Sequence, residues 1–206
     1  MSELVVPVLL TIITASTPLV FAAAGEVVVE KSGVLNLGVE GMMIVGAVVA
    51  FAVGVKTESA TLAILSGATG GMLTAFIFGF LTLRLLANQV ATGLALTIFG
   101  LGLSALIGHG FVGKTFSGLP KIGIPLLEQI PVLGSLLFVH DILVFLSVLA
   151  VFLITYVLNK TRLGLIIRAV GENHHAAHSI GYSVVWVRMG CILFGGSMAG
   201  LGGAYL

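Results

Sequence analysis

A glycine-rich run with a lysine is the first feature of this sequence that suggests chemistry. Residues 108–115 read Gly-His-Gly-Phe-Val-Gly-Lys-Thr and match the phosphate-loop pattern G-x-x-x-x-G-K-S/T at every fixed position. A working phosphate loop needs a buried strand before it and a helix after it, whose first amides face the phosphates. Here an apolar stretch comes before the run, and Pro120, Pro125 and Pro131 interrupt the segment after it. We therefore interpret the match as a coincidence.

Three histidines form a second cluster. His174 and His178 would share one face of a helix, and His175 lies between them. Zinc needs three or four converging ligands, and no carboxylate or cysteine cluster is near in sequence. The lone Cys191 lies in an apolar run and is interpreted as a small buried hydrophobe. We therefore expect a solvated polar face, with neither a metal nor a cofactor.

The composition indicates the kind of protein in which these residues lie. Of 206 residues, 58% are hydrophobic and 8% are charged, whereas a soluble domain carries about a quarter charged residues. A net charge of +1 provides no basic surface for nucleic acid. A spanning helix needs about 20 apolar residues, and six stretches come close: 4–25, 34–55 (interrupted only by Glu40), 59–83, 85–108, 142–159 and 189–206.

We therefore expect an all-α polytopic membrane protein, with about six spans in one domain, 1–206. The sequence stops at Leu206 inside an apolar stretch with no polar flank, so we also expect further helices in a longer protein. Glycine pairs four residues apart place small side chains on one helix face, which favours close helix packing. These pairs are Gly67 with Gly71, and Gly196 with Gly200.

Basic residues predict which connections face the cytoplasm. The segment 159–183 is the richest in lysine and arginine and is therefore assigned to the inside. Alternation of the spans then places the connections around residues 31 and 84 inside as well. The connections around residues 56 and 114 lie outside, together with the N-terminus.

Polar side chains within apolar stretches are candidates for a solute pathway. Asn88 and Gln89 lie near the start of the 85–108 stretch, where hydrocarbon cannot satisfy their amides. They could bind a polar solute or form hydrogen bonds between helices. Glu40 at mid-bilayer would cost about 2.5 to 3.5 kcal/mol, so it must face a cavity, a partner or an interface.

The segment 26–40 around that carboxylate has two interpretations. Gly33, Gly38 and Gly41 favour a broken helix whose free backbone groups could bind a ligand. The alternative is a wet cytoplasmic loop, which its charged residues favour.

The inner segment after residue 160 carries helical signals of its own. Apolar residues at helical spacing predict an amphipathic extension of the preceding span, interrupted at Gly171. These residues are Leu163, Ile166, Ile167 and Val170. Asn173 is a good N-cap for a short helix over 174–180, and Gly181 suits its C′ position. Such a helix could receive force from a soluble partner, although short capped helices also occur in ordinary loops.

The run 161–181 resembles the coupling segment of ABC-importer permeases of the ribose and branched-chain amino acid class. That class carries a pattern close to G-x-x-x-R-A-x-G-x-N-x-x-A-A-x-x-x-G. This chain supplies it with Gly164, Arg168, Ala169, Gly171, Asn173, Ala176, Ala177 and Gly181. His174 departs from the pattern, because many relatives have proline there.

Two further runs resemble one subgroup of that class. Residues 25–43 resemble the signature of permeases that import nucleosides and simple sugars with a lipoprotein receptor of the basic membrane protein type. Residues 88–93, Asn-Gln-Val-Ala-Thr-Gly, resemble the N-Q-V-x-S/T-G run of the subgroup. The resemblance covers roughly residues 15–206, and three ordered motifs make it specific.

The resemblance implies a permease subunit in the inner membrane, without catalytic residues. It implies as partners a cytoplasmic ATPase, a second permease subunit (the same or a similar chain) and an extracytoplasmic lipoprotein receptor. A short amphipathic helix predicted between Pro125 and Pro131 would lie on the outer side, where such a receptor docks. The implied ATPase-coupling residues are Arg168, Gly171, Glu172, Asn173, Ala176, Ala177 and Gly181. The pathway candidates are Asn36, Glu40, Asn88, Gln89 and Thr92.

Two other function classes compete with this interpretation. A secondary transporter or channel working alone would not need segment 161–181 to bind an ATPase. An intramembrane enzyme is disfavoured, because the spans contain no paired carboxylates, Ser-Lys pair or metal constellation.

Overall fold

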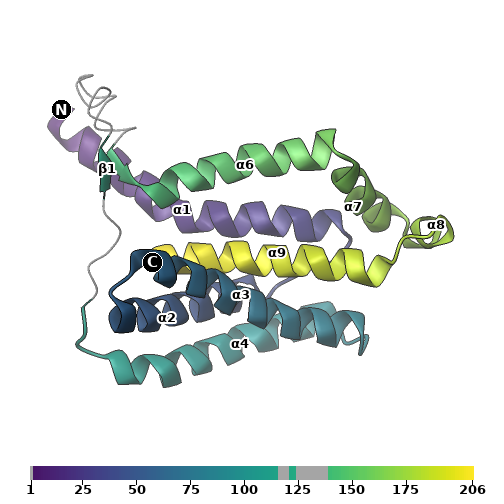
Figure 1. Ribbon diagram of the computed structural model, residues 1–206, viewed down its shortest axis with the longest axis horizontal. Coiled ribbons are helices and arrows are strands. Elements are labelled where there is room, and N and C mark those ends of the chain that lie inside the picture. The colour runs from purple at the N-terminus through teal and green to yellow at the C-terminus, as the bar shows by residue number, and fades with distance from the viewer. Residues whose placement is uncertain (1, 116–120, 124–138) are drawn as a thin grey trace.

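The computed structural model describes residues 2–115, 121–123 and 139–206. Long helices lie side by side in this part of the chain (Figure 1). They are α1 (Ser2–Lys31), α2 (Val39–Thr57), α3 (Ala60–Leu83), α4 (Gln89–Gly108), α6 (Ile142–Lys160) and α9 (Val184–Tyr205). The shorter elements are η1 (His109–Phe111), α7 (Arg162–Glu172), α8 (His174–Ser179) and the antiparallel strands β1 (Lys121–Gly123) and β2 (Val139–Asp141).

The six long helices are long and apolar enough to cross a membrane, which confirms the predicted all-α class and the number of spans. α2 and α4 begin at Val39 and Gln89, four to five residues later than predicted. Two other boundaries differ because the prediction stopped each span at a charged residue. α1 continues to Lys31, and α9 begins at Val184. The charged side chains near these ends stay in helices because they bond to backbone groups nearby: Glu26 accepts from Asn36, and Arg188 donates to the Ser32 carbonyl.

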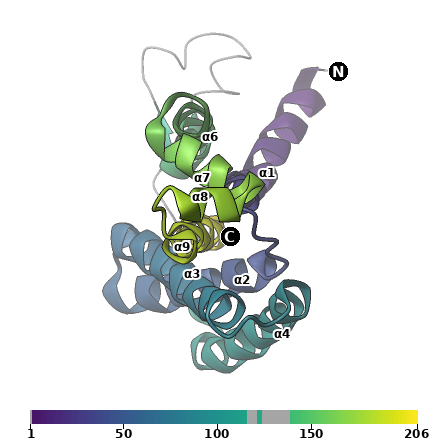
Figure 2. The ribbon, with the colours of Figure 1, turned by 90° about the vertical axis from the view of Figure 1, so that its right-hand side faces the viewer.

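α9 is the central helix of the bundle. It packs against α1, α2 and α3 and separates α1 and α6 from α2, α3 and α4 when the molecule is viewed from the end (Figure 2). The α3–α9 contact is made by glycines: a Cβ at Gly71 would overlap the Gly196 carbonyl, and one at Gly200 would overlap the Gly67 carbonyl. The predicted close packing at the two glycine pairs is therefore confirmed.

The helix ends form two faces. The α1–α2, α3–α4 and α6–α9 connections lie at one end, whereas the N-terminus, the α2–α3 turn and β1 lie at the other (Figure 1). This grouping matches the alternation predicted from the basic residues. We call the first end the coupling end, because it carries α7 and α8. The helix predicted between Pro125 and Pro131 lies outside the described residues.

Candidate functional site

α7 is a separate helix rather than a continuation of α6. Thr161 has extended backbone angles (φ −118°, ψ 161°), and its hydroxyl oxygen accepts a hydrogen bond from the Gly164 amide at 3.3 Å. Thr161 thus ends one helix and caps the next, so the predicted extension of the span was wrong at this residue. The chain turns here, and α7 leaves the direction of α6 at the coupling end (Figure 1).

Gly171 does not interrupt the helix as predicted, because α7 runs through it to Glu172. Its role is a close backbone contact with the end of α1. A Cβ at Gly171 would overlap the carbonyl oxygen of Lys31 and lie 3.1 Å from the Gly33 nitrogen. Only hydrogen fits at this position, so α7 presses directly on the α1–α2 connection.

The short helix α8 has both predicted caps. The Asn173 side-chain oxygen accepts from the Ala176 amide at 3.0 Å. Gly181 has a φ of +93°, and its amide donates to the His178 carbonyl while the Tyr182 amide donates to the Ala177 carbonyl. This pair of bonds is a Schellman motif with glycine at C′. The helix ends at Ser179, one residue earlier than expected, with Ile180 as its C-cap.

The two adjacent alanines of α8 have different surroundings. Ala177 is 2% exposed on a helix that packs against α7 and α9, whereas Ala176, like Glu172 and Asn173, is exposed. Arg168 of α7 is partly buried, and its Nε atom has no hydrogen-bond partner within the described part of the chain. Ala176 is therefore on the free surface of α8, and Ala177 is on the face that packs against the bundle.

Replacing Asn173 by alanine is expected to destabilise α8 by about 1 kcal/mol, because the Ala176 amide loses its capping acceptor. Hydrogen exchange at that amide should become roughly fivefold faster. Asn173→Asp keeps an acceptor and should exchange like the wild type. As a control, Asn159→Ala changes an exposed amide on α6 that bonds only within its own helix and should leave exchange in α8 unaltered. Equal exchange in both alanine variants would contradict the capping role.

The α1–α2 connection, residues 32–38, carries the first of the pathway candidates. Neither interpretation of 26–40 was correct as a whole, because α1 continues to Lys31 and only seven residues separate it from α2. Asn36 is 3% exposed, and its side-chain nitrogen donates to the Glu26 carboxylate at 3.3 Å. Its backbone amide donates to the same carboxylate, also at 3.3 Å. Glu26 fixes this connection, a role that its place in the sequence did not indicate.

The start of α4 carries three other candidates. Asn88 is the N-cap of α4, accepting from the Ala91 amide at 3.1 Å, so it does not lie inside the apolar span as predicted. Gln89 Oε1 accepts from the Leu35 amide at 2.9 Å. Thr92 is partly buried one turn further along. Gln89 therefore joins the 32–38 connection to α4. Asn88 is the last residue of the α3–α4 turn, and its side-chain oxygen bonds within the first turn of α4.

Glu40 lies at the start of α2 and not in the middle of a span. It is exposed in the first turn of α2, where a carboxylate is favoured by the helix dipole. The cost argued for a charge at mid-bilayer does not apply there. The structure thus brings Asn36 and Gln89 together through neighbouring residues of one short connection, and it leaves Glu40 at the surface.

Comparison with known proteins identifies the family. The sequence model of a family described as branched-chain amino acid transport system / permease component matches residues 8–206. The chain belongs to this permease family. With six apolar helices in the described part of the chain, the permease is a multi-pass integral protein of the inner membrane.

Individual relatives of the permease have names that refer to sugar or nucleoside transport. The permease is 38% identical over 198 residues to a putative glucose ABC transporter permease protein of Haloferax volcanii, covering 94% of this chain and 60% of that protein. It is 34% identical to a nucleoside ABC transporter permease protein of Lactococcus lactis, covering 92% of this chain and 63% of that protein. A guanosine ABC transporter permease protein of Bacillus subtilis is also 34% identical, and the match covers 91% of this chain and 63% of that protein. The chain thus spans about three fifths of the length of these relatives. No solved structure matches it.

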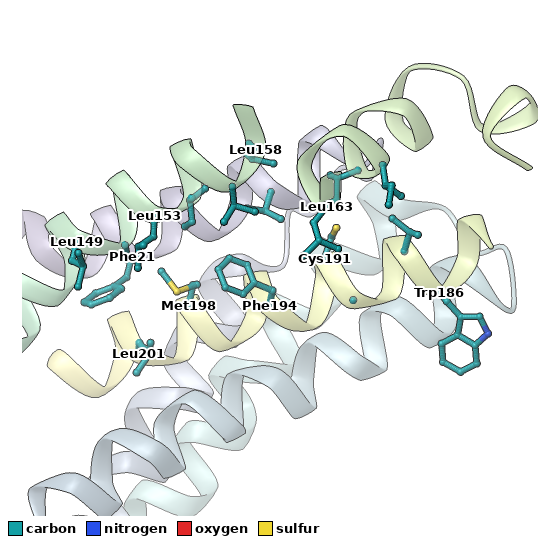
Figure 3. A pocket seen from close by; sticks show the side chains of 18 of the residues that line it. Phe21, Leu149, Leu153, Leu158, Leu163, Trp186, Cys191, Phe194, Met198 and Leu201 are labelled. Carbon is teal, nitrogen blue, oxygen red and sulfur yellow. The ribbon is translucent and has the colours of Figure 1, made fainter. Parts of the chain in front are cut away.

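An apolar groove runs along the permease between α6 and α9, with α1 beside them. Its volume is about 640 Å³, and Figure 3 shows Leu149 and Leu153 of α6 facing Met198 and Phe194 of α9. A sugar or nucleoside in this groove would leave its hydroxyls and amides without partners, which is costly. The groove is therefore not the pathway for a polar solute.

The phosphate-loop match and the histidines carry no site in the described residues. Gly108 ends α4 and is followed by η1, so a helix rather than a strand comes before the glycine-rich run. The rings of His174 and His175 lie 4.2 Å apart, at an exposed helix start. Within the described ranges, no group of three or more His, Cys, Asp or Glu could hold a metal ion.

Proposed function

We propose that this chain is the membrane-spanning part of an ATP-binding-cassette importer, which moves nucleosides or simple sugars into the cell. A separate cytoplasmic ATPase subunit binds and hydrolyses ATP, and the permease contributes no catalytic residue. The observation that carries this proposal is α8, a two-turn helix capped at both ends and exposed at the coupling end of the bundle. Its segment also carries the coupling pattern of the family.

Force applied to α8 has a short route into the bundle. Ala177 is buried where α8 packs between α7 and α9, and α9 in turn contacts α1, α2 and α3. Closure of an ATPase pair on α8 would therefore move the central helix and switch the pathway between outward and inward access. Arg168, Gly171 and Glu172 belong to the same coupling segment, on the helix immediately before α8.

The polar groups near the coupling end suit a hydroxylated or heterocyclic solute. Gln89 and Thr92 offer amide and hydroxyl groups, which can pair with sugar hydroxyls or with the edge of a base. The buried amide of Asn36 bonds to Glu26 and to the Gly38 amide, and it fixes the connection beside them. Relatives named for nucleoside and glucose transport support the same two cargo classes. A second permease subunit, identical or similar, completes the pathway, and an extracytoplasmic lipoprotein receptor delivers the cargo.

Uptake of labelled guanosine, glucose and leucine by cells that express the complete transporter tests the cargo class. We expect ATP-dependent uptake of guanosine or glucose, with no competition by excess leucine. Gln89→Glu retains an oxygen for the Leu35 amide but removes the amide donor, so KM should rise roughly three- to tenfold for the loss of about 1 kcal/mol. Asn159→Asp, an exposed amide on α6, is the matched control. Uptake of leucine alone, or an unchanged KM in Gln89→Glu, would contradict the assignment.

A further inference from the structure

The connection 32–38 touches three helices that are far apart in sequence. It is not a loose loop, because Ser32, Val34 and Asn36 are all at most 3% exposed. Its hydrogen bonds to α9 and α4 and its contact with Gly171 of α7 use backbone atoms of the connection or of the residue just before it. The Val34 side chain is buried in the core cluster that includes Leu96 of α4 and Ile192 of α9. We define these seven residues as the hinge connection.

The contact with α7 is between two backbones. Gly171 lies against the Lys31 carbonyl, and an added Cβ on Gly33 would be 3.1 Å from the Gly171 Cα. Gly33 has a φ of +82°, a backbone conformation that residues other than glycine rarely adopt. No side chain lies between α7 and the hinge connection at this point, so a movement of the end of α7 reaches the connection directly.

The contact with α9 is a hydrogen bond to a charged group. Arg188 Nε donates to the Ser32 carbonyl at 3.0 Å. The Arg188 guanidinium also lies beside Gly33, since a Cβ there would be 3.0 Å from its terminal nitrogen. The arginine therefore holds Ser32 and Gly33, and Gly33 is also in contact with α7. Charge-assisted bonds of this kind are stronger than neutral ones.

The contact with α4 consists of two hydrogen bonds and a close approach of two glycines. The Leu35 amide donates to Gln89 Oε1 at 2.9 Å, and Thr97 Oγ1 donates to the Leu37 carbonyl at 3.3 Å. Gly38 packs on Gly93, where a Cβ would be 3.2 Å from the carbonyl oxygen. Asn36, Gln89 and Thr92 thus lie on the hinge connection or in the first turns of the helix to which it is bonded.

We propose that the hinge connection is the relay between the ATPase-coupling segment and the solute pathway, with Gly171 and Arg188 as its positioning residues. The relay rests on the proposed function. Gly171 transmits displacement of α7 by backbone contact, and Arg188 ties the moving connection to α9. Gln89 passes the movement to α4, so the polar groups at positions 36 and 89 shift when α8 is pushed.

Arg188→Leu tests the relay in the complete transporter, measured as solute moved per ATP hydrolysed. The ATPase should still co-purify and hydrolyse ATP, while solute moved per ATP falls by about tenfold, as loss of an ordinary coupling free energy would produce. Arg188→Lys retains a charged donor, so its ratio of solute moved to ATP hydrolysed should lie between those of Arg188→Leu and the wild type. Gly190→Ala, on the same helix with nothing within 4 Å of an added Cβ, should match the wild type. An unchanged ratio in Arg188→Leu would overturn the proposal.

Hydrogen exchange of the wild-type transporter provides a second test, which does not depend on a variant folding. ATP binding to the assembled transporter should change exchange in 32–38 together with exchange in 171–181. If α8 is protected by the ATPase but 32–38 exchanges the same with and without ATP, the relay is wrong and the proposed function survives. If α8 gains no protection from the ATPase, both proposals fail.

Discussion

Replacement of Ala176 by tryptophan is expected to abolish co-purification of the ATPase subunit while leaving the permease folded in the membrane. Ala176 is exposed on α8, so the indole collides with the docked partner and not with the permease itself. An oversized side chain in a packed interface costs about 1 to 3 kcal/mol, which corresponds to a roughly five- to 150-fold weaker complex. The measurement is the ATPase recovered with tagged permease from detergent extracts.

Two comparison variants make this result specific. Val112→Trp enlarges a side chain that is 80% exposed at the opposite end of the bundle, so it should recover ATPase like the wild type. Ala177→Trp enlarges the buried neighbour and should weaken association by unseating α8, with a loss of thermal stability that Ala176→Trp does not show. If Ala176→Trp recovered as much ATPase as Val112→Trp, α8 would not be the docking element.

Replacement of Gly200 by leucine is expected to prevent stable folding of the bundle. A Cβ at this position overlaps the Gly67 carbonyl, and the obstacle is backbone, which a rotamer change cannot relieve. Separating α3 from α9 removes the contacts of the central helix, and we expect a cost above about 3 kcal/mol, the range of severe overpacking. The measurement is the midpoint of thermal unfolding in detergent, together with the yield of monodisperse protein.

The matched control for this prediction is on the same helix. Gly190→Leu makes the same chemical change, but an added Cβ at Gly190 meets nothing within 4 Å, and the leucine enters the apolar groove. Its unfolding midpoint should stay close to the wild-type value. Equal destabilisation by the two substitutions would show that glycine matters for helix flexibility or insertion, and not for the α3–α9 contact.

Features that depend on neighbours in sequence were predicted well. Six apolar stretches gave six long helices, and Asn173 and Gly181 cap α8 as their residue types indicated. Caps and spans follow from local hydrogen bonding and from hydrocarbon thickness. The glycine pairs of α3 and α9 were also predicted, because spacing by four residues marks one helix face.

Features that depend on distant contacts were not predicted. Gln89 and Leu35 are 54 positions apart, and Arg188 and Ser32 are 156 apart. Nothing local to either residue indicates its partner. The Arg188–Ser32 bond also explains why a charged residue remains in α9 near its start. Gly171 was misinterpreted as a helix breaker because its tertiary neighbour, the Lys31 carbonyl, cannot be inferred from the spacing of residues on α7.

Transport by this permease should depend on its ATPase subunit, and flux measurements in vesicles can show whether it does. The complete permease is reconstituted in proteoliposomes with the receptor and a labelled cargo, and uptake is measured with the ATPase and ATP, and again without the ATPase. We expect ATP-dependent accumulation in the first case and flux no greater than in protein-free vesicles in the second. Full-rate flux without the ATPase would contradict this expectation and would identify the permease as a transporter or channel that works alone.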